Sequence, residues 1–255
     1  MRFALAAVVM FAAASGRASP ASDIVGRPLV LDEGALELRL TAEINVERGR
    51  VAQPLSLAPD AWWGVARRWT VGVIHSNASV DRIGAGASLC VRQGGVPGCR
   101  GAYRNTGLDL RFSALEGAFA LAPRLRALIR DVEPFKPAVT LGAVMRWTQG
   151  RFAIASDPYV RLPLANHSLG NRAHLALPLW LAVQPARGWM IALHTGYDAD
   201  FAVLRDGGHG PFSLGARVRA TDDVDVGLEA GWADLLGPQH NGRQAAVLVS
   251  VDWRL

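Results

Sequence analysis

Charged residues recur at every second position over many segments of this chain, and this spacing is the main chemical signal in the sequence. Neighbouring residues of a β-strand point to opposite faces, so residues two apart share a face. A sheet built from such segments would carry a surface that can bind ions in pairs or guide charged solutes. The candidate residues for that surface are Glu37, Arg39, Glu43, Asp109, Arg111, Arg146, Arg151, Arg161, Arg172, His194, Arg217, Arg219, Glu229 and Arg254.

Histidines near hydroxyl or carboxyl groups are the candidates for hydrolytic chemistry. His75 and Ser76 are neighbours on one predicted strand, so their side chains point to opposite faces and cannot pair. His194 and Asp198 share a face but lie more than 10 Å apart, at roughly 3.4 Å per residue along a strand. The sequence contains neither a G-x-S-x-G nor an H-E-x-x-H motif. We therefore expect no catalytic residue, metal site or cofactor.

Two cysteines, Cys90 and Cys99, flank the segment VRQGGVPG. In an exported chain, two cysteines this close around a loop are expected to form a disulfide. A metal pair is the alternative, but the segment between them has no histidine or acidic residue to complete such a site. The sequence therefore favours a disulfide that pins a loop.

Apolar and polar residues alternate along most of the chain after residue 34, which predicts β-strands. The first segment, 35–47, is longer than an average strand of a soluble protein, and a membrane strand needs roughly 9–11 residues. A further strand-like stretch lies at 85–91. The predicted strands are 35–47, 55–66, 69–76, 105–114, 118–129, 138–147, 152–162, 172–183, 189–197, 211–220, 224–232 and 245–255.

The links between these strands alternate in length. The short links are 67–68, 115–117, 148–151, 184–188 and 221–223. The long links are 48–54, 77–104, 130–137, 165–171, 198–210 and 233–244. Short turns at one end and long loops at the other are typical of an outer-membrane barrel with both termini in the periplasm.

Aromatic residues gather near the strand ends, where membrane barrels carry aromatic girdles. The ring expected beside the short links consists of Trp63, Trp69, Phe112, Phe119, Trp147, Phe152, Trp189 and Trp253. The ring expected at the other rim consists of Tyr159, Tyr197, Phe212 and Trp232.

The N-terminus predicts export. Arg2 is followed by an apolar run and then by small residues, which is the pattern of a secretory signal. We expect residues 1–21 to be a cleaved signal peptide, 22–34 a short periplasmic lead-in, and 35–255 the barrel. The sequence pI is near 10, but the arginines are spread along the strands and form no basic run, so no nucleic-acid partner is expected.

The alternation alone does not say which face is inside, because a soluble barrel buries its apolar face and a membrane barrel exposes it. The export signal, strand length, aromatic rings and loop asymmetry all favour a membrane barrel. The candidates above would then line the lumen together with Asp60, Arg124, Arg126, Asp157, His174, Asp198, Asp225 and Asp252. They could form a lattice of ion pairs or a wet passage that favours small anionic solutes. Twelve strands lie between the roughly eight of a filled barrel and the 16–18 of an open channel.

The final segment, AAVLVSVDWRL, places Val247, Val249, Val251 and Trp253 on one face and ends at Leu255. It resembles the C-terminal strand of bacterial outer-membrane β-barrel proteins, in which the last residue is usually Phe or Trp. The resemblance implies an all-β, antiparallel, up-and-down transmembrane barrel of about 12 strands in the outer membrane. It also implies contact with lipid and lipopolysaccharide, and recognition of this strand by the outer-membrane assembly machinery.

The function expected for such a barrel is a passive pore or small-solute transporter, or a structural barrel with a charge-filled lumen. Two alternatives stay open at the level of the sequence. One is an outer-membrane lipid-modifying hydrolase, and the other is a barrel that binds a partner through its external loops.

Overall fold

The structure is a computed structural model that describes residues 24–49, 51–53, 55–75, 89–92, 105–239 and 241–255. The predicted signal peptide, residues 1–21, lies outside these ranges. No helix within them is long and apolar enough to cross a membrane.

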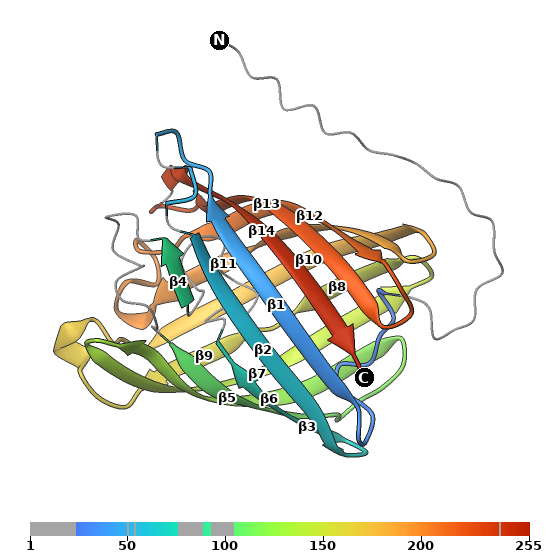
Figure 1. Cartoon of the computed structure of the whole chain (residues 1–255). Helices are drawn as coiled ribbons and strands as arrows, with labels where there is room; N and C mark the ends of the chain where they lie inside the picture. The colour runs from blue at the N-terminus through green and yellow to red at the C-terminus, as the bar shows by residue number, and fades with distance from the viewer. Residues whose placement is uncertain (1–23, 50, 54, 76–88, 93–104, 240) are drawn as a thin grey trace, which may run out of the picture.

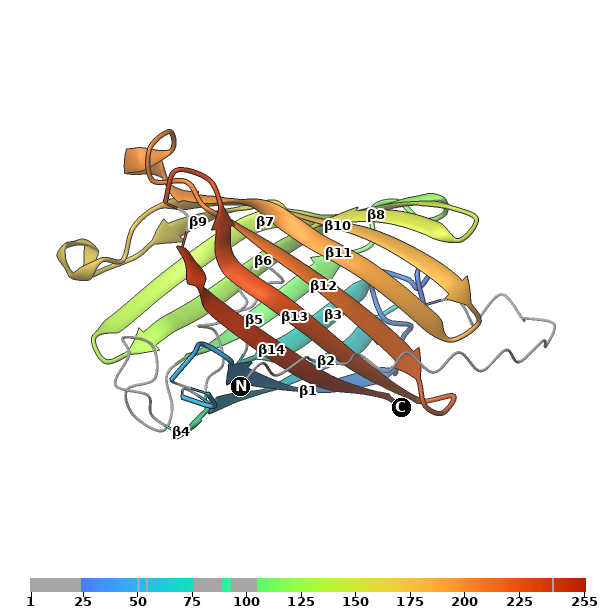
Figure 2. The ribbon, with the colours of Figure 1, turned by 90° about the horizontal axis from the view of Figure 1, so that it is seen from above.

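The described strands form one antiparallel sheet that closes on itself (Figures 1 and 2). The strands are β1 (Leu36–Asn45), β2 (Leu55–Ala66), β3 (Trp69–Ile74), β4 (Leu89–Arg92), β5 (Thr106–Phe112), β6 (Phe119–Val132), β7 (Phe135–Gln149), β8 (Phe152–Ser156), β9 (Tyr159–Pro163), β10 (His174–Ala186), β11 (Trp189–Asp200), β12 (Gly210–Arg219), β13 (Val224–Leu236) and β14 (Asn241–Arg254). Two short 3-10 helices, His167–Leu169 and Phe201–Val203, lie in loops.

The wall has twelve positions, as the alternation predicts. The strands follow the order β1-β14-β13-β12-β11-β10-β8-β7-β6-β5-β3-β2, and β2 pairs again with β1. β8 and β9 share one position, because both pair with β7 and with β10. β4 is an extra strand that pairs with β2. The predicted all-β antiparallel barrel of about 12 strands is confirmed.

The predicted strand 152–162 is split in two at Pro158. Proline has no backbone N–H and cannot donate to a ladder. The carbonyl of Pro158 still accepts a hydrogen bond from the Ala143 backbone N–H, at 3.1 Å. The wall therefore continues past the break, although the strand does not.

The prediction of a long loop at 130–137 is wrong. β6 and β7 continue until only Glu133 and Pro134 separate them. β13 and β14 extend in the same way and leave the link 237–240. Apolar alternation ends where a strand leaves the bilayer, but backbone hydrogen bonding between paired strands does not depend on apolar side chains.

The barrel is apolar outside and polar inside. Leu108 and Leu228 are 62% and 55% exposed, whereas Asp252 and Arg126 are 0% and 2% exposed. A soluble barrel would show the opposite arrangement. The strand faces are therefore those of a barrel whose outer surface meets lipid.

Most of the predicted short-turn ring points outward. Trp63, Trp147 and Phe152 are exposed, and the rings of Trp69 and Phe112 lie 4.8 Å apart between their centroids. At the other rim, Phe212 and Trp232 are exposed cross-strand partners.

The prediction that Tyr159 joins the other rim is wrong. Tyr159 is buried inside the barrel, and the guanidinium carbon of Arg126 lies 4.5 Å from the centroid of its ring. The reason is strand parity, because Tyr159 shares its face with Asp157 and Arg161.

The C-terminal strand closes the barrel, as predicted. β14 pairs with β1 in a register that places Trp253 opposite Leu38 and Asp252 opposite Arg39. The backbones of Leu36 and Leu255 exchange two hydrogen bonds of 2.8 Å at the end of this seam.

Candidate functional site

The inward face of the barrel is the candidate functional site. Most of the candidate residues lie there and are buried or half-buried. These residues are Glu37, Arg39, Glu43, Asp109, Arg111, Arg146, Arg161, His194, Arg217, Arg219, Glu229 and Arg254.

Arg151 and Arg172 do not belong to the wall, contrary to the prediction. Both are exposed and lie outside the strands. The Nη1 of Arg151 donates to the backbone oxygen of Pro185 at 3.1 Å, and Arg172 precedes β10, which begins at His174. The alternation in the sequence continues past the sheet, but backbone pairing no longer fixes the direction of a side chain there.

The half of the lumen lined by β5 to β9 is packed with ion pairs. Arg124 donates from Nε to Asp109 at 2.6 Å and also pairs with Asp157. Asp109 accepts further hydrogen bonds from Arg111 Nε and Trp62 Nε1, both at 2.9 Å. The side chains of Arg124 and Asp109 are only 6% and 0% exposed. This half of the lumen is therefore a closed lattice.

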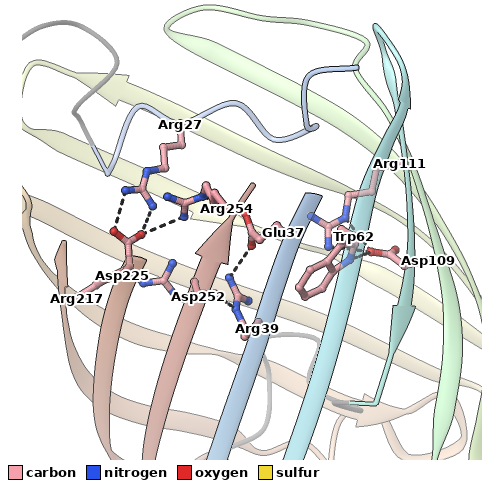
Figure 3. Close-up of polar contacts among 10 residues, drawn as sticks. All are labelled: Arg27, Glu37, Arg39, Trp62, Asp109, Arg111, Arg217, Asp225, Asp252 and Arg254. Carbon is pink, nitrogen blue, oxygen red and sulfur yellow. Dashed lines mark hydrogen bonds and ion pairs between the residues drawn. The ribbon is translucent and has the colours of Figure 1, made fainter. Parts of the chain in front are cut away.

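Trp62 is a lumen residue that the sequence reasoning missed. Its ring lies between two guanidinium groups, 5.3 Å from that of Arg39 and 5.2 Å from that of Arg111 (Figure 3). Such cation–π contacts hold arginines in place without neutralising them. Strand parity could have found Trp62, because it shares a face with Asp60.

The half of the lumen lined by β12, β13, β14 and β1 carries a second ion-pair network (Figure 3). Its members, in the order of their contacts, are Arg27, Asp225, Arg254, Glu37, Arg39, Asp252 and Arg217. The side chains of Arg39, Arg254 and Arg217 are 30%, 26% and 24% exposed. Three arginines of this network are therefore part-exposed to the lumen, whereas Arg124 at the centre of the opposite lattice is buried.

Glu229 forms a separate cluster on β13. Its Oε1 accepts a hydrogen bond from the Ser213 hydroxyl and lies 3.1 Å from His194 Nδ1. The His194 ring stacks on Trp180, with centroids 4.6 Å apart. Ser213 and Trp180 were not predicted as lumen residues. The hydroxyl and the imidazole meet through the carboxylate and not directly, whereas an activated serine needs direct contact with its base.

The other candidates for hydrolysis are engaged differently. His75 Nδ1 lies 2.5 Å from the backbone oxygen of Pro59, and Ser76 lies outside the described residues. Asp198 pairs with His174, which also contacts Asp200 at 3.2 Å. Across the ranges that the structure describes, no group of three or more His, Cys, Asp or Glu side chains could hold a metal ion.

A cavity of about 220 Å³ lies against the wall from β10 to β2. Its lining includes the charged side chains of Arg39, Arg217 and Glu229 and the apolar side chains of Trp180 and Met190. Among the described residues, the lumen therefore has a buried ion-pair lattice against β5 to β9 and a cavity against the wall from β10 to β2.

Residues 24–34, which we call the mouth segment, begin beside β10 and end beside β2. The Val25 backbone N–H donates to Gln184 of β10 at 3.3 Å. The Gly34 backbone N–H donates to the Gly64 carbonyl of β2 at 2.8 Å. Five wall positions separate β10 from β2 in either direction around the barrel. The segment therefore crosses the diameter of the barrel.

The mouth segment is held along its whole length at the end of the barrel that carries the short turns. The guanidinium of Arg27 pairs with Asp225, and the carbonyl of Arg27 accepts a hydrogen bond from Arg146. Further along, the Leu31 N–H donates to Thr70 Oγ1 at 2.8 Å. The part of the predicted lead-in that the structure describes thus folds into the barrel.

The predicted disulfide cannot be placed. Cys90 lies on β4, where its backbone pairs with Ser56 of β2, and Cys99 lies outside the described residues. The pairing of these two cysteines stays a prediction.

Comparison with known proteins supports the fold. No protein-family model and no curated protein matches the sequence. The NanC porin is 9% identical, with a TM-score of 0.60 over 86% of this chain and 100% of that one. The KdgM porin, solved in complex with disordered oligogalacturonate, is 9% identical, with a TM-score of 0.57 over 85% of this chain and 98% of that one.

An outer membrane channel from Pseudomonas putida F1 is also similar. It is 12% identical, with a TM-score of 0.54 over 89% of this chain and 97% of that one. Structural similarity at identities this low shows a common fold, but it does not show which solute this chain would transport. Together with the lipid-type outer surface and the closed seam, these likenesses show that the chain is a β-barrel with the fold of bacterial outer-membrane porins and channels.

Proposed function

We propose that this chain is a passive pore for small solutes in the bacterial outer membrane. The observation that carries the proposal is the asymmetry of the lumen. The β5–β9 side is filled by buried ion pairs, whereas the opposite side has a cavity of about 220 Å³ bordered by part-exposed charges. A cavity bordered by part-exposed charges offers a path for a small polar solute, whereas a lumen filled throughout by ion pairs would offer none.

The two uses of the charges expected from the sequence are thus combined. The lattice of Arg124, Asp109 and Asp157 braces one side of the wall. The other side, with Arg39, Arg217 and Glu229, would be the solute path. This division explains how twelve strands, which lie between filled and open barrels, could give a narrow pore.

Small anionic solutes are the class that the charge of the wall favours. Within the second ion-pair network four arginines meet three carboxylates: Asp252 is shared by Arg39 and Arg217, Asp225 by Arg27 and Arg254, and Glu37 by Arg39 and Arg254. A surplus of fixed positive charge in a narrow space concentrates anions. The complex of the KdgM porin with oligogalacturonate, a carboxylate-bearing saccharide, supports the same class.

The mouth segment would set the width of the pore at its short-turn end. It crosses the barrel and is tied to opposite walls by Val25 and Gly34. Solutes would have to pass beside it, which restricts the pore to small molecules.

The proposal includes the route of the chain to the membrane. Residues 1–21 would be removed as a secretory signal, and the assembly machinery of a Gram-negative cell would read the C-terminal strand. The outward apolar belt would then contact lipid and lipopolysaccharide, and Cys90 and Cys99 would form a disulfide in the oxidising periplasm.

Conductance of the purified protein in planar lipid bilayers tests the proposal. We expect small, stable single-channel steps and, in a KCl gradient, a reversal potential that indicates preference for chloride. Folded protein, recognised by heat-modifiable migration on a gel, that stays silent at all voltages and admits no small sugar into liposomes would overturn it.

A further inference from the structure

Glu229 has different partners from the acidic residues of the ion-pair lattice and of the second ion-pair network. Asp109 and Asp252 each bind two arginines, whereas the hydrogen-bond partners of Glu229 are Ser213 and His194. Neither partner is a permanent cation. The side chain of Glu229 is 30% exposed, so it presents a negative charge to the lumen.

Arg217 presents the opposite charge. Its Nη2 lies 3.4 Å from Asp252 Oδ2, while Arg39 binds the other oxygen of the same carboxylate. Arg217 has only this shared contact to a carboxylate among its ion pairs, and the network as a whole has four arginines for three carboxylates. The side chain of Arg217 is 24% exposed, so it adds positive charge to the same region of the lumen.

Both charges border the 220 Å³ cavity. In the register of β12 and β13, Gly215 lies opposite Glu229 and Gly227 lies opposite Arg217. The two charged residues are therefore diagonal neighbours, with backbones roughly 7–8 Å apart, and each faces a glycine. A Cβ at Gly227 would lie 2.4 Å from the Ser250 hydroxyl, which would have to rotate away.

The remaining lining of the cavity adds the cross-strand partners Arg39 and Asp60 and an apolar side. Trp180 and Met190 border it from β10 and β11. Stacking on His194 holds the Trp180 ring in place. A volume of about 220 Å³ is below the roughly 300 Å³ at which pockets for drug-sized ligands begin. The cavity therefore fits small molecules with a short carbon skeleton.

We propose that this cavity binds small amino-carboxylates, that is, solutes with an ammonium and a carboxylate close together. The ammonium would lie at Glu229, the carboxylate at Arg217 and the carbon skeleton against Trp180 and Met190. A simple anion would meet Glu229, and a simple cation would meet Arg217 and Arg39. An amino-carboxylate forms a charge-assisted contact at each pole. The inference rests on the proposed pore function, and it adds to the small anions favoured by the surplus of arginines a second solute class that this cavity would select.

Liposome swelling with alanine and lactamide tests the inference. The two molecules are similar in size and have no net charge at pH 7, but only alanine carries an ammonium and a carboxylate. We expect alanine to enter wild-type proteoliposomes at least threefold faster than lactamide, after subtraction of the rate in liposomes without protein.

Substitutions then assign the preference to the cavity. Glu229→Gln and Arg217→Gln should each bring the ratio of alanine to lactamide close to one. Arg151→Gln is the matched control, because Arg151 is exposed and lies outside the wall, and it should keep the wild-type ratio. Each variant is first checked for heat-modifiable migration.

The outcomes separate this inference from the pore proposal. Equal entry of both solutes in the wild type, or an alanine preference that survives Glu229→Gln, would overturn the amino-carboxylate site and leave the pore intact. Entry of neither solute would instead count against the pore itself.

Discussion

Arg27 of the mouth segment forms a two-pronged ion pair with Asp225 of β13, a residue 198 positions later in the chain. Asp225 is almost fully buried and also binds Arg254, at 3.0 Å. This contact joins a segment outside the predicted barrel to the barrel wall, and it makes the N-terminal region part of the lumen.

Removal of residues 24–34 should widen the pore. The segment crosses the barrel between β10 and β2, so its loss should raise the single-channel conductance several-fold in planar bilayers. Arg27→Gln should give a smaller rise and flickering steps, because it frees one tether and leaves the others. An unchanged conductance in the deletion variant would show that the solute path does not pass this segment.

Loss of Arg124 should destabilise the barrel more than loss of any exposed arginine. Arg124 binds both Asp109 and Asp157 in a buried setting, and removal of one partner from a buried ion pair costs about 3–5 kcal/mol. Because Asp109 keeps Arg111 and Trp62, we expect Arg124→Gln to fall near the lower value.

Urea unfolding in detergent micelles measures this effect through the midpoint and slope of the transition. Arg151→Gln serves as the control, since an exposed substitution should change the unfolding free energy by no more than about 0.5 kcal/mol. Equal midpoints for the two variants would contradict a stabilising lattice.

Arg39 should contribute to ion selectivity. Its side chain is 30% exposed and borders the cavity, so Arg39→Gln lowers the positive charge along the proposed path. We expect the reversal potential in a KCl gradient to move toward that of a non-selective pore. Arg172→Gln, a change at an exposed residue outside the strands, should leave the potential unchanged. A shift toward stronger chloride selectivity would count against the path.

The C-terminal seam should be essential for insertion. Trp253 lies opposite Leu38, and Leu255 exchanges backbone hydrogen bonds with Leu36. Deletion of residues 253–255 removes these contacts, so we expect the protein to be absent from the outer-membrane fraction and to lose heat-modifiable migration. Leu255→Phe keeps the backbone bonds and should insert normally. Normal insertion of the truncated chain would show that the seam closes without these residues.

Much of the fold could be predicted from local pattern alone. Each of the twelve predicted strands coincides with a wall position, and the strand-like stretch near residues 85–91 overlaps the extra strand β4. These features follow from a period of two residues, which every strand carries in its own sequence.

The function of the lumen depends on contacts that no local pattern carries. Arg124 and Asp109 pair across neighbouring strands, whereas Arg27 and Arg39 reach partners 198 and 213 positions away. Closure and strand pairing decide which charges meet, so only the tertiary structure showed that one side of the lumen is packed and the other is open.

The sequence by itself therefore determined the strands, the apolar and polar face of each strand, and the strand that closes the barrel, because alternation is a property of neighbouring residues. The tertiary structure decided that Arg151 and Arg172 lie outside the wall and that residues 24–34 cross the mouth. Those outcomes depend on where the sheet ends and on which distant side chains the closed barrel brings within a few ångströms of one another.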